Sequence, residues 1–337
     1  MKFIQKLSIV KLSIVALISC FGCSSSHSQD EQQTAQLPVE LQLQVSTPFQ
    51  FVVYGDSRFH DPKDTEAANP AVRQALVQAI AQTNPAFISF GGDIVYNGYD
   101  KDDWKVWDSE TAVWREKKIP VYPALGNHDL HGDEKIALAN YFQRFPELNH
   151  SRYYSVRAAN LLMLVLDSSL DEIAGQQGEW LTQKLDRLPA DVQFVLIVLH
   201  HPPYTSSSDA KMFGGGHSAR SQELSLARML EARQLNLRAR IVVFSGHVHN
   251  YERHEHGGVT YFVTGGAGAH AYPIERARHD PFQSKEINYH YLQVEYDQDM
   301  LKITMNRLDL TSGTPVWTQP DSVTISVPSA KAVAAGR

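Results

Sequence analysis

Four histidines fall within the stretch SGHVHNYERHEHGG, which runs from Ser245 to Gly258. Imidazole is the side chain that most often binds transition metals in proteins. His247 and His249 are two residues apart directly after an apolar run, so both rings point the same way in an extended chain. His254 and His256 share this spacing but stand among charged residues, with no apolar run leading into them. We therefore predict that His247 and His249 bind a metal ion and that the other two histidines are solvated.

Four more polar motifs follow apolar runs in the same way. In an open α/β sheet, the loops beyond the carboxyl ends of strands line the binding crevice. Asp, Asn and His side chains at five such ends would form one convergent site of hard and borderline metal ligands. Each motif alone is more often a turn or a polar loop, but the five together indicate a metal site. The four motifs are GDSR at 55–58, GDIVY at 92–96, GNHD at 126–129 and HHPP at 200–203.

The elements that must position these motifs follow from the hydrophobic pattern. From Val259 onward, four alternating runs predict an antiparallel sheet. Asn69 and Pro70 are suited to the N-cap and first position of a helix, and a further helical stretch is rich in tryptophan. With no linker dividing residues 46–328, we predict one α/β domain. Buried strands are predicted at 49–55, 86–92, 119–126, 160–167, 193–200 and 240–246, and helices at 69–82, 134–145, 176–188 and 221–235.

The motifs, above all GDIVY and GHVHNYER, resemble those of the calcineurin-like metallophosphoesterase superfamily, and more narrowly those of the purple acid phosphatases. The resemblance covers about residues 49–309. It implies an α/β fold with a two-sheet β-sandwich core flanked by helices and a dinuclear metal site at the carboxyl-terminal edge of the strands. It also implies a phosphatase that hydrolyses phosphate monoesters by attack of a metal-bound hydroxide.

The resemblance also implies a set of metal ligands. Arg58 stands where the broader superfamily has the histidine of a D-x-H motif, and a guanidinium cannot bind a cation. Tyr96 is the replacement implied by the purple acid phosphatase motif G-D-x-x-Y, and a phenolate favours Fe(III). His201 is preferred to His200 because the family reads His-x-Pro here and Pro203 follows His201 by two residues. The implied ligands are Asp56, Tyr96 and His249 on Fe(III), Asp93 as the bridge, and Asn127, His201 and His247 on a divalent iron, zinc or manganese ion.

Four residues are candidates for catalytic roles beside the metals. His128, carried over from the family, would contact phosphate or assist the leaving group, and Asp129 would orient its ring. His217, in the loop SSSDAKMFGGGHSAR, is either a second such residue or part of a surface loop. Arg58 either donates bidentate hydrogen bonds to the phosphate oxygens or pairs with an acidic neighbour.

Other functions remain compatible with the same residues. A phosphodiesterase or nucleotide phosphohydrolase could use the same site, and a non-catalytic surface lipoprotein could use the same scaffold. The non-catalytic alternative is disfavoured because such a protein normally lacks at least one ligand, and all seven are present. A net charge of -6 without a basic block argues against nucleic-acid binding.

The N-terminus predicts export. Residues 1–19 combine lysines with a short apolar run, as signal peptides do, and LISC at 17–20, which ends in Cys20, resembles a bacterial lipobox. We predict acylation of Cys20, a polar tether over 20–45, the catalytic domain over 46–328 and a tail at 329–337. The protein would then be an outer-membrane or periplasmic lipoprotein that touches the membrane only through its anchor; ordinary secretion is the alternative. Both cysteines lie at 20 and 23, which excludes a disulfide framework in the domain.

Overall fold

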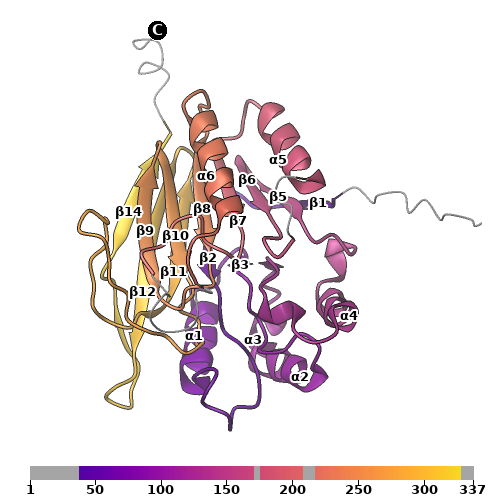
Figure 1. Cartoon of the computed structure of the whole chain (residues 1–337), viewed down its shortest axis with the longest axis vertical. Coiled ribbons are helices and arrows are strands. Elements are labelled where there is room, and N and C mark those ends of the chain that lie inside the picture. The colour runs from indigo at the N-terminus through magenta and orange to yellow at the C-terminus, as the bar shows by residue number, and fades with distance from the viewer. Residues whose placement is uncertain (1–37, 171–174, 208–216, 328–337) are drawn as a thin grey trace, which may run out of the picture. The chain divides into compact units, whose positions relative to one another are not determined.

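Two β-sheets form the centre of the protein, with helices on their outer sides (Figure 1). The computed structural model describes residues 38–170, 175–207 and 217–327, which belong to one compact unit, Leu37–Arg337. The predicted signal peptide, Cys20 and the tail from 329 lie outside the described residues. No helix within the described ranges is long and apolar enough to cross a membrane.

The first sheet has the strand order β1-β5-β6-β7-β8-β10-β9. Strand β7 pairs in parallel with β6 and β8, and β8 pairs in parallel with β10, so the loops that follow β7 and β8 emerge at one edge. β1 lies within residues 20–45, where a tether was predicted, so ordered structure begins at least six residues earlier than expected. The strands are β1 (Glu40–Leu43), β5 (Tyr154–Ala158), β6 (Leu161–Val165), β7 (Phe194–Val198), β8 (Arg240–Ser245), β9 (Tyr251–His256) and β10 (Val259–Thr264).

The second sheet has the order β13-β12-β11-β2-β3-β4, and β14 also pairs with β12. Its parallel strands β2, β3 and β4 place three more loops at a common edge, whereas the pairings among β11 to β14 are antiparallel. The strands are β2 (Phe49–Tyr54), β3 (Ile88–Phe90), β4 (Val121–Pro123), β11 (Tyr289–Asp297), β12 (Met300–Asp309), β13 (Val316–Thr318) and β14 (Ser322–Ser326).

The helices predicted at 69–82, 134–145, 176–188 and 221–235 begin and end within two residues of these bounds. Asn69 caps α1 by accepting hydrogen bonds from the backbone N–H groups of Ala71 and Val72, at 3.1 and 3.2 Å, and Pro70 opens the helix. The tryptophan-rich stretch forms two helices that break at Thr111. The α-helices are α1 (Pro70–Thr83), α2 (Lys101–Glu110), α3 (Ala112–Glu116), α4 (Glu134–Arg144), α5 (Gln176–Asp186) and α6 (Ser221–Gln234), with 3-10 turns at His128–Leu130 and Pro146–Leu148.

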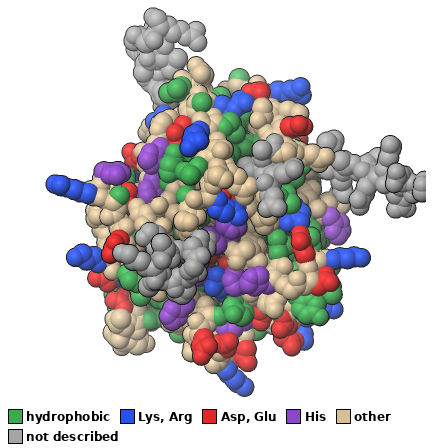
Figure 2. Space-filling model, in the orientation of Figure 1, with side chains coloured by type: hydrophobic (Ala, Val, Ile, Leu, Met, Phe, Trp, Pro, Cys, Tyr) green, Lys and Arg blue, Asp and Glu red, His purple; other side chains and the backbone are tan. Residues whose placement is uncertain are grey.

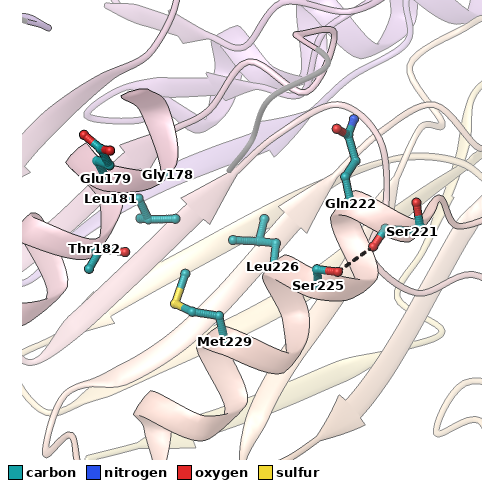
Figure 3. Close-up of a pocket in the computed structure, with 9 residues that line it drawn as sticks. All are labelled: Gly178, Glu179, Leu181, Thr182, Ser221, Gln222, Ser225, Leu226 and Met229. Carbon is teal, nitrogen blue, oxygen red and sulfur yellow. Dashed lines mark hydrogen bonds between the residues drawn. The ribbon is translucent and has the colours of Figure 1, made fainter. Parts of the chain in front are cut away.

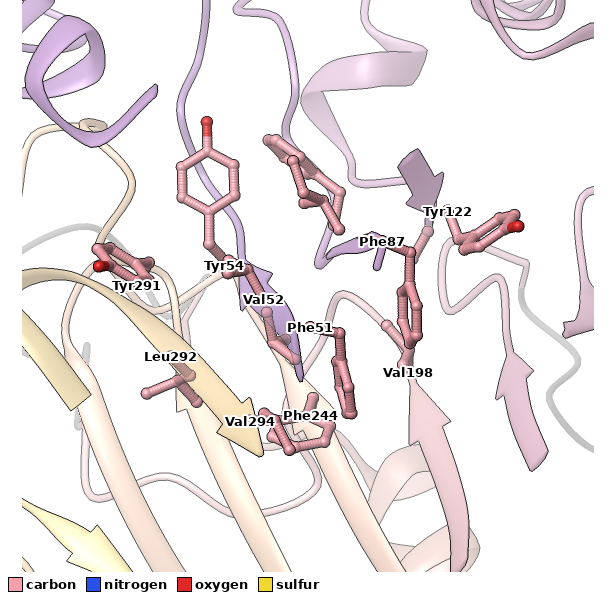
Figure 4. Close-up of a cluster of buried hydrophobic side chains, with 14 of the residues drawn as sticks. Phe51, Val52, Tyr54, Phe87, Tyr122, Val198, Phe244, Tyr291, Leu292 and Val294 are labelled. Atoms are coloured by element: carbon pink, nitrogen blue, oxygen red, sulfur yellow. The ribbon is translucent and has the colours of Figure 1, made fainter. Parts of the chain in front are cut away.

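The main hydrophobic core lies between the two sheets (Figure 4). Phe51 of β2 stacks on Phe87, with ring centroids 4.6 Å apart, and both belong to the same buried cluster as Val198 of β7 and Phe244 of β8. Burying a side chain of this size stabilises the fold by roughly 1.5–3 kcal/mol. This core holds the carboxyl-terminal ends of the two parallel strand groups in one place.

Strand β7 is buried on both faces. Phe194, Leu196 and Val198 join the core between the sheets, while Val195 and Ile197 join a second core against α5 and α6. The alternation follows from the two-residue period of a strand, and a strand covered on both faces reads as a continuous apolar run. The same alternation also sets the direction in which the side chains after β7 point.

A cavity of about 530 Å³ opens between α5 and α6 (Figure 3). Leu181, Leu226 and Met229 form its apolar walls, and the Ser225 hydroxyl donates to the Ser221 carbonyl at 2.9 Å. None of the residues predicted to bind metal or substrate lines this cavity.

The predicted α/β fold with a two-sheet core flanked by helices is confirmed. The prediction that β10 joins the C-terminal antiparallel sheet is wrong, because β10 pairs in parallel with β8 and antiparallel with β9 in the other sheet. The segment predicted as a loop around His254 is β9 itself. The strand could not be recognised from the hydrophobic pattern, because the segment is rich in charged residues whose partners lie far along the chain.

Candidate metal centre

Five strand ends meet at the candidate site. Asp56 follows β2, Asp93 follows β3, Asn127 follows β4, His200 follows β7 and His247 lies two residues after β8. The side chains of all but Asn127 are buried. Two groups of residues that could hold a metal ion lie here: Asp56, Asp93 and His249 in one, and His200, His201 and His247 in the other.

Backbone contacts lock these loops together. The Asp56 N–H donates to the Gly92 carbonyl at 3.0 Å, and the Gly246 N–H donates to the His200 carbonyl at 2.9 Å. Gly92 has φ +89°, and a Cβ at this position would lie 2.8 Å from Nδ1 of His200. Only glycine can therefore occupy position 92 without displacing that ring.

Four side chains at the site sit on unusual backbone. Asp56, Arg58, Asp93 and His247 have φ values of 66°, 47°, 53° and 69°, in the left-handed region that non-glycine residues rarely adopt. Each such residue costs of order 1–3 kcal/mol, and clusters of them are typical of functional sites. These strained conformations indicate that the site requires side-chain directions that an unstrained turn would not give.

The first ligand group contains a ring nitrogen that makes no hydrogen bond to any described residue. Nδ1 of His249 lies 2.9 Å from the His270 carbonyl and donates to it, so the neutral ring presents a lone pair at Nε2. Nε2 is buried, finds no hydrogen-bond partner among the described residues and lies 3.8 Å from Oδ1 of Asp56. Burial, with the Arg58 charge adding to it, lowers the pKa of His249 well below its usual range. A neutral imidazole facing a carboxylate fits a metal ion.

Asp56 is buried with both oxygens turned toward the site. Its two oxygens each lie 3.0 Å from the backbone nitrogen of His247. Burial, reinforced by the neighbouring Asp93 carboxylate, raises the pKa of Asp56 well above its usual range. Ligand oxygens of Asp56 and Asp93 lie within 4.8 Å of each other, and a cation between them would let both carboxylates stay ionised.

The second ligand group is centred on His200. Nε2 of His200 lies 3.0 Å from Oδ1 of Asn127, 3.2 Å from Nδ1 of His247 and 3.4 Å from Oδ1 of Asp93. Nδ1 of His247 is also 3.1 Å from the Asn127 oxygen. The Asp93 carboxylate therefore reaches both ligand groups, as a bridging ligand would.

His201 lies beside His200 in the second ligand group but makes a contact of its own. Its Nδ1 lies 2.9 Å from the Ser168 hydroxyl, although its ring is 4.3 Å from that of His247, centroid to centroid. His200 thus makes the close contacts to Asn127, Asp93 and His247, while His201 belongs to the same group of candidate ligands, and its ligation of a metal stays a prediction. The signal was present in the sequence: His200 continues the even-numbered residues of β7 that face the second sheet, whereas His201 continues the side facing the helices.

Tyr96 lies at the exposed rim of the site. Its ring stacks on His128 with centroids 5.3 Å apart, and 39% of its surface is exposed. Nδ1 of His128 lies 2.7 Å from the Tyr96 carbonyl, and burial lowers the pKa of His128 to about 4. A neutral His128 therefore donates from Nδ1 and presents an unprotonated Nε2. Ligation of a metal by the Tyr96 hydroxyl stays a prediction.

Asp129 does not orient His128, contrary to expectation. Its carboxylate accepts hydrogen bonds from the backbone N–H groups of Ile94, Val95 and Gly126, at 2.8, 3.2 and 2.9 Å. Burial, with the Asp93 charge adding to it, raises the pKa of Asp129 to about 8. Asp129 thus ties the loop after β3 to the loop after β4.

Arg58 and His217 both reach the site. Nε and Nη2 of Arg58 lie 3.3 and 3.2 Å from Oδ2 of Asp93, so the pairing with an acidic neighbour is present. The His217 ring lies 4.8 Å from that of His247 and 5.6 Å from that of His249, centroid to centroid. Figure 2 shows histidine side chains gathered across the middle of one face of the molecule, with basic side chains among them.

The prediction that His254 is solvated is wrong. His254 is 5% exposed and lies between two carboxylates, whereas His256 is partly exposed and stacks on Tyr204 with centroids 4.0 Å apart. The alternation of β9 turns both rings to one face. Sequence reasoning missed this because the partner carboxylate of Asp280 lies far along the chain.

Comparisons with known proteins place the chain among phosphoesterases. A sequence model described as calcineurin-like phosphoesterase matches residues 49–251. Purple acid phosphatase 23 of Arabidopsis thaliana is 30% identical over 145 residues, which are 40% of this chain and 30% of the relative. Phosphoenolpyruvate phosphatase of Allium cepa is 27% identical over 203 residues, covering 56% of this chain and 40% of the relative. This chain therefore spans less than half the length of these relatives.

Solved structures show the same fold. A purple acid phosphatase isolated from yellow lupin (Lupinus luteus) seeds aligns with a TM-score of 0.62 and 16% identity, over 84% of this chain and 54% of that one. A dimetal phosphatase from Danio rerio aligns with a TM-score of 0.53 and 13% identity, over 83% of this chain and 99% of that one. The family model covers more than half of the chain, and the predicted family is confirmed.

Proposed function

This chain belongs to the calcineurin-like phosphoesterase family, and we propose that it is a phosphatase that binds two metal ions and hydrolyses phosphate monoesters. The observation that carries the proposal is the pair of ligand groups joined by Asp93. Family members of the purple acid phosphatase type hold a dinuclear centre, and the buried, unpartnered Nε2 of His249 fits one of its ions. In such a centre the ions bind the phosphate and activate the attacking water.

In the proposed arrangement, Asp56, Asp93 and His249 hold one ion, and Asp93, Asn127, His200 and His247 hold the other. The support for His200 in place of His201 is the set of three short distances from its Nε2. Burial lowers the pKa of His200 and His249, so these rings stay neutral and the carboxylates bring the negative charge. Two cations therefore leave a net positive centre, which suits a phosphate dianion.

The residues around the ions act on the substrate. Arg58 is positioned beside Asp93 to offer guanidinium N–H groups to phosphate oxygens. Nε2 of His128 is placed to share the proton of a phosphate or leaving-group oxygen. His217, beside the rings of His247 and His249, is the second group that can pass a proton to the leaving alkoxide.

The identity of the ions forms a finer part of the proposal. Tyr96 would bind Fe(III) beside Asp56 and His249, with divalent iron, zinc or manganese in the other position. The basis is the G-D-x-x-Y motif, at residues 92–96, together with an arginine at position 58 that cannot serve as a ligand. A visible tyrosinate-to-iron absorption band that disappears in Tyr96→Phe is the expected result. A colourless protein with two bound ions would remove Tyr96 from the ligands and leave the phosphatase proposal intact.

The test of the activity uses metal analysis and paired substrates. The full chain, purified without chelator, should carry two ions and hydrolyse p-nitrophenyl phosphate much faster than bis(p-nitrophenyl) phosphate. Faster hydrolysis of the diester would instead establish a phosphodiesterase at this site. A protein that binds no metal and hydrolyses neither ester after reconstitution would refute the proposal.

A further inference from the structure

A buried group of charged side chains lies beyond the metal ligands. Glu252 and His254 belong to β9, and Asp280 lies in the segment before β11; their exposed fractions are 2%, 5% and 9%. Burying charged groups is costly unless each is paired and hydrogen bonded. We call these three residues the Glu–His–Asp cluster.

Both nitrogens of His254 face a carboxylate. Nε2 lies 3.2 Å from Oε2 of Glu252, and Nδ1 lies 3.4 Å from Oδ1 of Asp280. A neutral imidazole has one N–H, so its other nitrogen would set a lone pair against a carboxylate oxygen. Only the imidazolium presents an N–H to both carboxylates, hydrogen bonding to Glu252 and lying at ion-pair distance from Asp280. The geometry therefore assigns a positive charge to His254 between two negative ones.

The two carboxylates together hold one short segment of chain. Glu252 accepts from the Thr205 hydroxyl and from the Ser206 backbone N–H, both at 2.6 Å. Asp280 accepts from the Ser206 hydroxyl at 2.5 Å and from the Ala277 N–H at 2.9 Å. Ser206 is thus fixed through its backbone and its side chain at once.

The held segment is a direct continuation of the metal site. Ser206 is separated from His200 by only five residues, and two of these are Pro202 and Pro203, whose rings restrict the backbone. Glu252 stands three residues after His249, at the start of β9. The Glu–His–Asp cluster therefore ties the chain that carries His200 to the chain that carries His247 and His249.

We propose that His254 is a positioning residue for the metal centre. As an imidazolium it allows Glu252 and Asp280 to stay ionised and buried, and the two carboxylates hold Ser206 and, through the prolines, His200 in place. The expected effect on metal binding rests on the proposed dinuclear centre. The hydrogen bonds from Ser206 to Glu252 and Asp280, which we call the brace, require no metal. It assigns a role to the third histidine of the opening stretch that does not involve metal binding.

The perturbation that tests this is His254→Gln. A glutamine amide donates to one carboxylate and leaves the other without the imidazolium charge, with only Arg276 still acting on both, so the hold on Ser206 weakens. In protein loaded with Zn²⁺ alone, one of the two ions should be released to a competing chelator about 10- to 100-fold more readily, which is the usual effect of disturbing a group behind a metal ligand. The other ion should lose less affinity, because Asp56 and His249 make no hydrogen bond to Ser206 among the described residues.

A second readout needs no metal. The Ser206 amide hydrogen should exchange with solvent about tenfold faster in metal-free His254→Gln than in the metal-free wild type, because Glu252, its acceptor, loses its charged partner and holds it less firmly. The double variant His254→Gln with Asp280→Asn removes the Asp280 carboxylate, which would otherwise lack the imidazolium charge. The amide oxygen introduced at position 280 can still accept from Ser206. The double variant should recover most of the Zn²⁺ retention and slow the exchange again.

The matched control is His279→Gln, which replaces an exposed imidazole next to Asp280. It should leave both readouts unchanged. Unchanged Ser206 exchange in His254→Gln would overturn the proposal, as would loss of both Zn²⁺ ions together with the folded state, which would mark a general contribution to stability. If the wild type bound no Zn²⁺, the dinuclear centre would fail, and the exchange measurement would still decide whether the brace exists.

Discussion

The two adjacent histidines after β7 offer a direct test of the metal centre. His200→Ala removes the nitrogen that lies 3.0 Å from Asn127 and 3.4 Å from Asp93. His201→Ala removes a ring whose Nδ1 lies 2.9 Å from the Ser168 hydroxyl. We expect the first variant to lose one metal ion and the second to keep both.

The size of the difference follows from these contacts. Disturbing a residue that supports a ligand costs about 10- to 100-fold in metal affinity, so removing a ligand itself should cost more than about 100-fold. His200→Ala should therefore release one ion during gel filtration, with a matching loss of kcat. His201→Ala should lose at most about 100-fold in affinity for that ion.

The assay is the Zn²⁺ content per chain after gel filtration, together with a competition titration against a chelator. Thermal unfolding of the metal-free variants serves as the control, because a cavity in place of either buried ring lowers stability. If His201→Ala lost an ion while His200→Ala retained two, the geometric argument would be refuted and the ligand predicted from the His-x-Pro spacing would be correct.

Four further outcomes are expected. Arg58→Ala should raise KM for p-nitrophenyl phosphate about tenfold, since a charge-assisted bond to phosphate is lost; an unchanged KM would leave Arg58 only its pairing with Asp93. Asp129→Ala should lower the free energy of unfolding in urea by about 3 kcal/mol or more, because three buried N–H groups lose their acceptor; a loss below about 1 kcal/mol would contradict this. Asn69→Ala should cost about 1 kcal/mol in the same measurement, as loss of a helix N-cap does. Cys20→Ser should abolish incorporation of labelled fatty acid in cells, and continued labelling would exclude the predicted anchor.

The placement of the site could be predicted because it depends on local pattern. Apolar runs that end in GDSR, GDIVY and GNHD form β2, β3 and β4, and each motif lies at the carboxyl end of its strand. Parallel strands bring such ends to one edge, so no knowledge of distant contacts was required. The helix cap at Asn69 and Pro70 is equally local, and it was predicted correctly.

The wrong predictions concern residues whose surroundings are set by segments far along the chain. β10 was assigned to the wrong sheet because its alternation fits either an antiparallel or a parallel neighbour, and β8 supplied the parallel one. Asp129 was expected to act on its neighbour His128, but it accepts from backbone groups at 94 and 95, which reach it only after β3 and β4 pair side by side.

The sequence by itself determined which residue types stand at the strand ends, and therefore that carboxylate, amide and imidazole side chains suited to a metal would gather there. Only the tertiary structure decided which of two neighbouring histidines lies close to Asn127 and Asp93 and whether a third is buried. The physical reason is that side-chain chemistry and strand period are properties of a short segment, whereas burial and charge compensation depend on what packs against it. His254 carries the same imidazole as His249, but Glu252 and Asp280 surround it, and these neighbours give it a different task.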